Sequence, residues 1–133
     1  MTLASRPTMP LLSSLGLVSL ALGALSGWLV LALTERPDWF RDHGIPAPGR
    51  FRQAHLDWIM MGLVLIAVQT VAPGMPAWIR GCIAFGTMVN PLLFLPLAWG
   101  LQVKQHPVYK TVGIVSFLSL SIGLPALAIW AIG

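Results

Sequence analysis

Four long runs of apolar residues dominate the chain, at about 11–33, 53–73, 77–101 and 108–132. Each run approaches or exceeds the roughly 20 residues that a helix needs to cross about 30 Å of hydrocarbon. Backbone polar groups inside lipid must be satisfied within their own segment, so each run is expected to be helical. The pattern therefore predicts an all-α fold, an integral membrane four-helix bundle that forms a single domain over 1–133.

The connections between these runs are short, with one exception. Residues 73–76 and 102–107 are tight links, whereas the loop at 34–52 holds three of the four acidic residues and half of the basic ones. A charged loop of this length in so small a protein is expected to pack on the membrane surface or to cap a site. Its aromatic pair, Trp39 and Phe40, suits the membrane interface.

The basic residues are distributed unevenly between the two sides of the predicted bundle. Arg6 and Arg80 fall on the side of the termini. The side of the two charged loops holds Arg36, Arg41, Arg50, Arg52, Lys104 and Lys110. Because cytoplasmic loops carry an excess of Lys and Arg, the distribution predicts that loops 34–52 and 102–107 are cytoplasmic. Both termini are then expected on the side of the membrane away from the cytoplasm, and the membrane is expected to be a bacterial inner membrane.

The composition adds mainly exclusions. Hydrophobic residues make up 56% of the chain and charged residues 9%, which is too little charge to cover a water-exposed surface. The net charge of +4 does not indicate a nucleic-acid partner, because the basic residues stand at helix ends and form no patch. The single cysteine, Cys82, excludes an internal disulfide. The sequence also lacks the familiar motifs for hydrolysis and phosphoryl transfer.

Small residues recur at helical spacing in the first and last runs. They are Gly16, Ser19, Gly23, Ser26 and Gly27 in the first run, and Gly113, Ser116 and Gly123 in the last. Such rows let helices approach closely in lipid, either within one chain or between copies of it. Pro91, Pro96 and Pro125 are expected to kink or open their helices, and opened helices can line a cavity.

Polar side chains within a membrane are costly, so each is a candidate for function. The candidates are His55, Asp57, Gln69, Thr87 and Asn90. His55 is expected at the start of the second helix, on one face with Gly62 and Gln69. This pattern suits an axial haem ligand, since a glycine two turns away leaves room for a flat macrocycle. The alternative is a histidine that hydrogen-bonds locally at the interface.

Asp57 and Asn90 each have several possible roles. Asp57 lies about 200° around the helix from His55, so the two cannot share one face. We expect Asp57 to act as an acid at the helix start, or to pair with a basic residue at the membrane surface, rather than to transfer protons. The basic candidates are Arg50, Arg52 and Lys104. Asn90 could hydrogen-bond between helices, bond a carbonyl freed by Pro91 or Pro96, or hold a substrate oxygen.

Several segments together resemble the small four-helix membrane family of styrene oxide isomerase and hydroxylaminobenzene mutase. The second run opens with Ala-His-Leu-Asp at 54–57 and continues with Met61-Gly62, which is similar to the family's Ala-His followed six residues later by Asn-Gly. The third run reads Gly-Thr-Met-Val-Asn at 86–90 and ends at Trp99-Gly100, similar to the family's Gly-Thr-Tyr-x-Asn and Trp-Gly. Length, helix number and the long first loop also agree, so the resemblance covers nearly the whole chain.

The resemblance implies a homotrimer that binds haem b between neighbouring subunits. His55 would ligate the iron, with Met61 and Gly62 at the cofactor. The implied activity is isomerisation of a small hydrophobic, aryl epoxide-like substrate that enters from the lipid bilayer, with Asn90 in contact with it. Ferric iron would act as a Lewis acid and the product would be an aldehyde, formed without a supply of electrons. The protein would contribute orientation and the exclusion of water.

Two residues depart from the family pattern. Met61 stands where the family has Asn, and Met88 where it has Tyr. Both changes remove polar groups that would hold the substrate oxygen, so the sequence indicates haem binding more directly than isomerisation. The thioether of Met61 is itself a candidate second iron ligand. Two alternatives stay open: a haem-binding redox or sensor protein, and a small transporter or assembly subunit whose polar residues only pack helices.

Overall fold

The computed structural model describes residues 8–133, and this part of the chain is helical without any strand. The long helices are α1 (Leu11–Glu35), α3 (Gly49–Val71), α4 (Ala77–Leu92) and α5 (Pro107–Ile132). The short ones are α2 (Pro37–Asp42) and the 3-10 helices η1 (Pro96–Trp99) and η2 (Leu101–Gln105). Four segments are long and apolar enough to span a membrane, the third running from α4 to Trp99. The predicted all-α membrane four-helix bundle is therefore confirmed.

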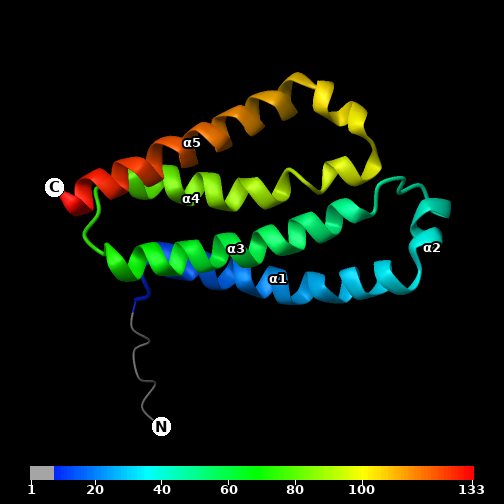
Figure 1. Ribbon diagram of the computed structural model, residues 1–133, viewed down its shortest axis with the longest axis horizontal. Helices are drawn as coiled ribbons and strands as arrows, with labels where there is room; N and C mark the ends of the chain where they lie inside the picture. The colour runs from blue at the N-terminus through cyan, green and yellow to red at the C-terminus, as the bar shows by residue number, and fades with distance from the viewer. Residues whose placement is uncertain (1–7) are drawn as a thin grey trace, which may run out of the picture.

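The long helices pack largely in the order in which they occur in the chain. Figure 1 shows α3 beside α1, α4 beside α3, and α5 on the outer side of α4. The start of α1 and the C-terminus lie at one end of the bundle, which we call the terminal end, and α2, η1 and η2 lie at the other, which we call the loop end. Arg6, which entered the sequence-based orientation, lies outside the described residues.

Small residues bring α1 and α3 into close contact. A Cβ added to Gly16 would lie 2.9 Å from the backbone oxygen of Gly62, and one added to Gly62 would lie 2.9 Å from the backbone oxygen of Gly16. A Cβ on Gly23 would lie 2.6 Å from Ile59 Cγ1. The small residues of α1 therefore serve packing within the chain, as one of the two sequence-based alternatives proposed.

The contact between α4 and α5 uses the same device. A Cβ on Gly86 of α4 would lie 3.0 Å from the backbone oxygen of Ser116, and one on Gly123 of α5 would lie 3.0 Å from Ile83 Cγ1. The Ser116 hydroxyl donates to the Gly86 carbonyl at 3.3 Å. Two close-packed hairpins, α1 with α3 and α4 with α5, are thus the units of the bundle.

A buried apolar cluster joins the two hairpins at the terminal end. Its members are Leu12, Leu65, Ala72, Met75, Ile79 and Ile83, with Met88 packed against it. It combines residues of α1, α3 and α4 with the turn between the hairpins. Most side chains of the long helices are at least partly exposed, which suits a protein whose outer surface faces lipid.

The predicted loop at 34–52 is partly helical and packs onto the loop end. It contains α2, and α3 begins at Gly49, earlier than the predicted 53. Phe40 of α2 is buried in a second apolar cluster with Leu33, Phe51 and Ala98. The N–H of Ala47 donates to the Ala98 carbonyl at 3.0 Å. The segment therefore covers the ends of α1, α3 and η1.

Prolines divide the predicted third helix. The α-helical part of 77–101 ends at Leu92 and continues as tighter turns into η1 and η2, so the opening expected at Pro91 and Pro96 is found, although the α-helix ends earlier than the predicted bound. In such turns the Leu93 carbonyl would accept from residue 96, but Pro96 has no N–H. The Tyr109 hydroxyl of α5 donates to this carbonyl instead, at 2.8 Å. By contrast, α5 continues past Pro125.

The Gly16–Gly62 approach predicts opposite effects for two Gly→Ala substitutions. Gly16→Ala should destabilise the protein by about 1–3 kcal/mol, because the new methyl meets backbone that cannot move aside. Gly81→Ala, on an exposed part of α4 with nothing within 4 Å of its Cβ position, should be neutral or stabilising by up to about 1 kcal/mol. Denaturation in detergent, followed by circular dichroism, measures both. Equal effects of the two variants would contradict the close approach of α1 and α3.

The Tyr109–Leu93 bond predicts a specific cost for losing one hydroxyl. Tyr109→Phe should destabilise the protein by about 1–2 kcal/mol, since it leaves the Leu93 carbonyl without a donor. Thr111→Val is the matched control, because the Thr111 hydroxyl bonds only the preceding turn of its own helix and is exposed. It should change stability by less than about 0.5 kcal/mol. The same unfolding assay in detergent measures both variants. An unchanged free energy of unfolding in Tyr109→Phe would show that this bond does not stabilise the opened segment.

Candidate functional site

His55 lies inside a helix rather than at its start. Because α3 begins at Gly49, the histidine is six positions, or about 9 Å, along the helix axis. Its side chain is half-buried against α1. A Cβ on Gly27 would lie 3.5 Å from His55 Cε1, an ordinary van der Waals distance, so the ring lies next to this part of α1. The expectation of a position at the helix start was therefore wrong by almost two turns.

The hydrogen bonds of His55 fix which ring nitrogen is free. Nδ1 lies 2.8 Å from the Gly23 carbonyl oxygen and 3.0 Å from Ser26 Oγ, while the Ser26 hydroxyl donates to the same carbonyl at 2.9 Å. A carbonyl oxygen can only accept, so Nδ1 carries the proton and donates it to Gly23. In the neutral ring, Nε2 then has a free lone pair. Nε2 makes no hydrogen bond with any residue from 8 to 133.

Gly62 and Met61 do not form an open site with His55 in one chain. The space beside Gly62 is filled by α1, since a Cβ there would lie 2.9 Å from both Gly16 O and Leu20 Cγ. The room that the sequence suggested for a macrocycle is therefore taken by a helix. Met61 is half-buried and about 240° around α3 from His55, so the structure does not bring its thioether to the histidine.

Asp57 and Asn90 form a polar pair between α3 and α4. The Asn90 amide Nδ2 donates to Asp57 Oδ2 at 2.7 Å. Both expected roles of Asp57 were wrong: the carboxylate bonds Asn90 of α4 rather than Arg50, Arg52 or Lys104, and the first turn of α3 holds no acid. For Asn90, the alternative of a bond between helices is the one found. The carbonyl freed by proline is bonded by Tyr109 instead, a residue that the sequence gave no reason to select.

The two polar sites lie on different sides of α3. His55 bonds to Gly23 and Ser26 of α1, whereas Asp57 bonds to Asn90 of α4. This agrees with the separation of about 200° expected from their spacing. Within one chain, the predicted iron ligand and the predicted substrate contact are therefore not parts of one cavity.

Of the remaining polar candidates, Gln69 is buried in α3 and Thr87 makes a local hydrogen bond, as the other two histidines of the chain also do. The Thr87 hydroxyl donates to the Ile83 carbonyl at 2.6 Å and is fully buried. His43 Nδ1 lies 2.6 Å from the Trp39 carbonyl oxygen, and His106 Nδ1 accepts from the Val108 N–H at the start of α5. Between residues 8 and 133 no group of three or more His, Cys, Asp or Glu side chains could hold a metal ion. His43 and His55 both have Nδ1 beside a backbone carbonyl, and His55 is the one of the two that lies within a candidate membrane span.

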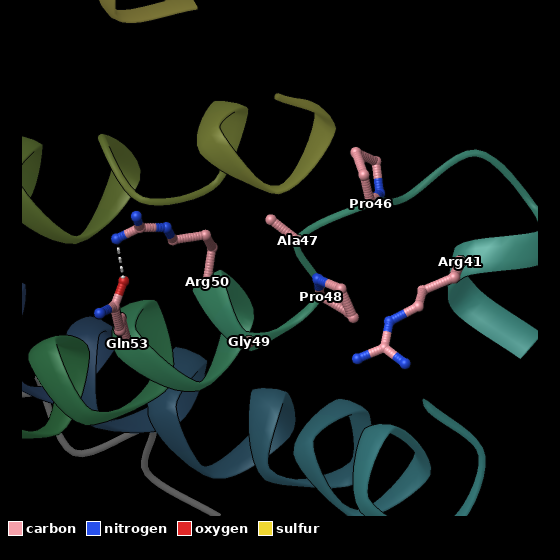
Figure 2. A pocket seen from close by; sticks show the side chains of 7 residues that line it. All are labelled: Arg41, Pro46, Ala47, Pro48, Gly49, Arg50 and Gln53. Atoms are coloured by element: carbon pink, nitrogen blue, oxygen red, sulfur yellow. Dashed lines mark hydrogen bonds between the residues drawn. The ribbon is translucent and has the colours of Figure 1, made fainter. Parts of the chain in front are cut away.

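A separate pocket lies at the loop end of the bundle. Figure 2 shows it where the segment 46–49 leads into α3. It has a volume of about 380 Å³ and is open to the surface. Its lining comprises Arg41, Pro46, Ala47, Pro48, Gly49, Arg50 and Gln53. The sequence indicated only a charged loop here, because the pocket depends on where the fold places Arg41 of α2 relative to the start of α3.

Comparisons of the chain with known protein families, with curated proteins and with solved structures find no match.

The Asp57–Asn90 bond predicts energetic coupling between α3 and α4. In a double-mutant cycle of Asp57→Ala with Asn90→Ala, the coupling should be about 0.5–1.5 kcal/mol, the range found for hydrogen bonds between membrane helices. Thr70→Ala with Asn90→Ala is the control cycle, since the exposed Thr70 hydroxyl bonds only the Ile66 carbonyl of α3. Unfolding in detergent supplies the free energies. Additive effects of Asp57→Ala and Asn90→Ala would mean that the pair does not hold the hairpins together.

Proposed function

We propose that the protein is a haem-b-binding membrane protein of the styrene oxide isomerase type, with His55 as the axial ligand of the iron. The observation that carries the proposal is the donation by His55 Nδ1 to the Gly23 carbonyl at 2.8 Å. Histidines that ligate metals usually donate their other ring N–H to a carbonyl or carboxylate, which fixes the ring and the tautomer. His55 has this arrangement, and its Nε2 is the nitrogen left for iron.

The fit of the remaining residues limits where haem could bind. Because α1 fills the space beside Gly62, the cofactor would lie outside the helix packing of the single chain. A position between copies of the chain satisfies this requirement, which supports the homotrimer implied by the family resemblance. Gly62 then contributes by letting α1 approach and so placing Gly23 and Ser26 against the histidine.

The proposed reaction is the rearrangement of a small hydrophobic epoxide to an aldehyde. Bound ferric haem would supply Lewis acidity toward the epoxide oxygen. The chain would hold the cofactor through His55 and keep water away from the reacting carbon, since the surrounding helices are apolar and face lipid. A substrate of this kind would enter from the bilayer. A role for Asn90 at the same site requires the neighbouring subunit, because in one chain it is on the other side of α3 from His55.

A haem protein without isomerase activity is the second candidate. The Asn90 amide is already committed to Asp57. Met88, at the family's Tyr position, packs against the apolar cluster at the terminal end. Neither Asn90 nor Met88 then offers a free polar group to a substrate oxygen within one chain, and this favours a redox or sensor role for the haem.

The proposed orientation follows from the described charges. Arg36, Arg41, Arg52, Lys104 and Lys110 are exposed and lie in or beside the connections at the loop end, whereas Arg80 lies near the terminal end. We place the loop end in the cytoplasm and both termini outside, as expected for a bacterial inner membrane protein.

The haem proposal predicts a visible spectrum that depends on His55. Protein purified in detergent after expression with ample haem should show a Soret band, and His55→Ala should lose most of it because the iron loses its ligand. His43→Ala is the matched control, since this exposed histidine stacks on Trp39 and should leave the band intact. A colourless wild-type protein, or a band unchanged in His55→Ala, would reject the proposal.

Enzyme assay then separates the two haem functions. With a chiral aryl epoxide and no reductant, an isomerase should yield the aldehyde, and His55→Ala should abolish the product along with the haem. A protein that binds haem through His55 but forms no aldehyde is the redox or sensor protein. Gas chromatography of the reaction extract distinguishes these results.

A further inference from the structure

The pocket at the loop end lies at the level expected for phospholipid headgroups. Trp39 of α2 and Trp99 of η1 flank this end and are 50% and 53% exposed. Exposed tryptophans of membrane proteins concentrate at the boundary between hydrocarbon and headgroups. The pocket is formed at the start of the membrane-spanning α3, so its contents would face headgroups rather than acyl chains.

The charged lining of the pocket is entirely basic. Arg41 and Arg50 line it, and no acidic residue does. Arg50 is half-buried and donates from Nη1 to Gln53 Oε1 at 2.7 Å, but no described carboxylate lies within ion-pair distance of it. Arg41 does contact Asp38, at 3.2 Å, yet that carboxylate stands outside the lining on a side chain that is 84% exposed. The first turn of α3 also lacks an acid. Of the two arginines in the lining, Arg50 therefore has no carboxylate partner among the described residues, and Arg41 shares its charge with an exposed carboxylate.

The shape of the pocket favours a ligand longer than a single phosphate ion. Figure 2 shows Arg41 reaching from α2 toward Pro48, while Arg50 extends on the other side of the segment 46–49 toward Gln53. Pro46, Ala47 and Pro48 form a stiff apolar wall between the two guanidinium groups. A ligand that uses the whole pocket needs an anionic group that accepts from arginine and a neutral part that lies along this wall.

We propose that this pocket binds the headgroup of an anionic phospholipid, with Arg41 and Arg50 contacting the headgroup from the two sides of the segment 46–49. A phosphodiester accepts charge-assisted hydrogen bonds, and its glycerol neighbours suit the apolar wall. The site is separate from His55, and the proposal does not depend on haem. The lipid would tie α2 to the start of α3 and fix the loop segment against the membrane surface.

Calorimetric titration in nonionic detergent tests the proposal, with dioctanoyl phosphatidylglycerol as the probe. Wild type should bind this lipid, and dioctanoyl phosphatidylcholine should not compete. The double variant Arg41→Gln/Arg50→Gln should lower the affinity at least about 30-fold, because it removes two charge-assisted contacts. The matched double variant Arg36→Gln/Arg52→Gln removes the same charge from exposed positions outside the pocket and should lower it less than about threefold.

A second variant separates the pocket from its charge. Ala47→Leu fills the pocket without changing any charge, and it should weaken lipid binding as much as the double variant Arg41→Gln/Arg50→Gln does. If circular dichroism shows that Arg41→Gln/Arg50→Gln does not fold, Ala47→Leu provides the test. Full binding by Ala47→Leu, or an equal loss in Arg36→Gln/Arg52→Gln, would overturn the proposal in favour of diffuse surface charge. Sodium phosphate that binds alone and displaces the lipid at similar concentration would overturn it in favour of a free-anion site.

Discussion

The close contact between α1 and α3 is the constraint on which the rest of the structure depends. It requires a backbone-to-backbone approach at Gly16 and Gly62 that no larger residue permits without movement. The same approach places the Gly23 carbonyl and the Ser26 hydroxyl beside His55. In lipid, association of helices relies on packing and on bonds of this kind, because burial of apolar surface gives little advantage there. Helix packing and the orientation of the histidine therefore have one cause.

Helix α3 separates two polar environments on its opposite sides. On one side an imidazole is held by α1 with its free nitrogen turned away from Gly23, and on the other a carboxylate is held by the Asn90 amide of α4. The spacing of His55 and Asp57 makes this separation unavoidable on a helix. The proposed iron ligand His55 and the Asp57–Asn90 bond that connects the two hairpins can thus lie at nearly the same depth in the bundle without contacting each other.

The sequence predicted the helical class and the number of spans well, because runs of about 20 apolar residues have few other solutions. It also predicted that Asp57 and His55 would face different ways. The start of α3, the end of α4 at Leu92, and the partner of Asp57 were mispredicted. Each of these depends on contacts between segments distant in sequence: the folding of α2 onto α3, the Tyr109 bond that supports the opened turn, and the alignment of α3 with α4. The haem ligation itself remains a prediction from the resemblance and from the hydrogen bonding of His55.

The chain-ordered packing has a consequence for biogenesis. Since α1 contacts α3 and α4 contacts α5, each hairpin can pair as soon as its second helix has entered the bilayer, before later residues are synthesised. Contacts between elements close in sequence form quickly, so we expect the docking of two finished hairpins to be the slow step. That docking uses the apolar cluster at the terminal end, the Asp57–Asn90 bond, and the backbone bond from Ala47 to Ala98. Assembly of the bundle is in this sense a binding reaction between two halves of one chain.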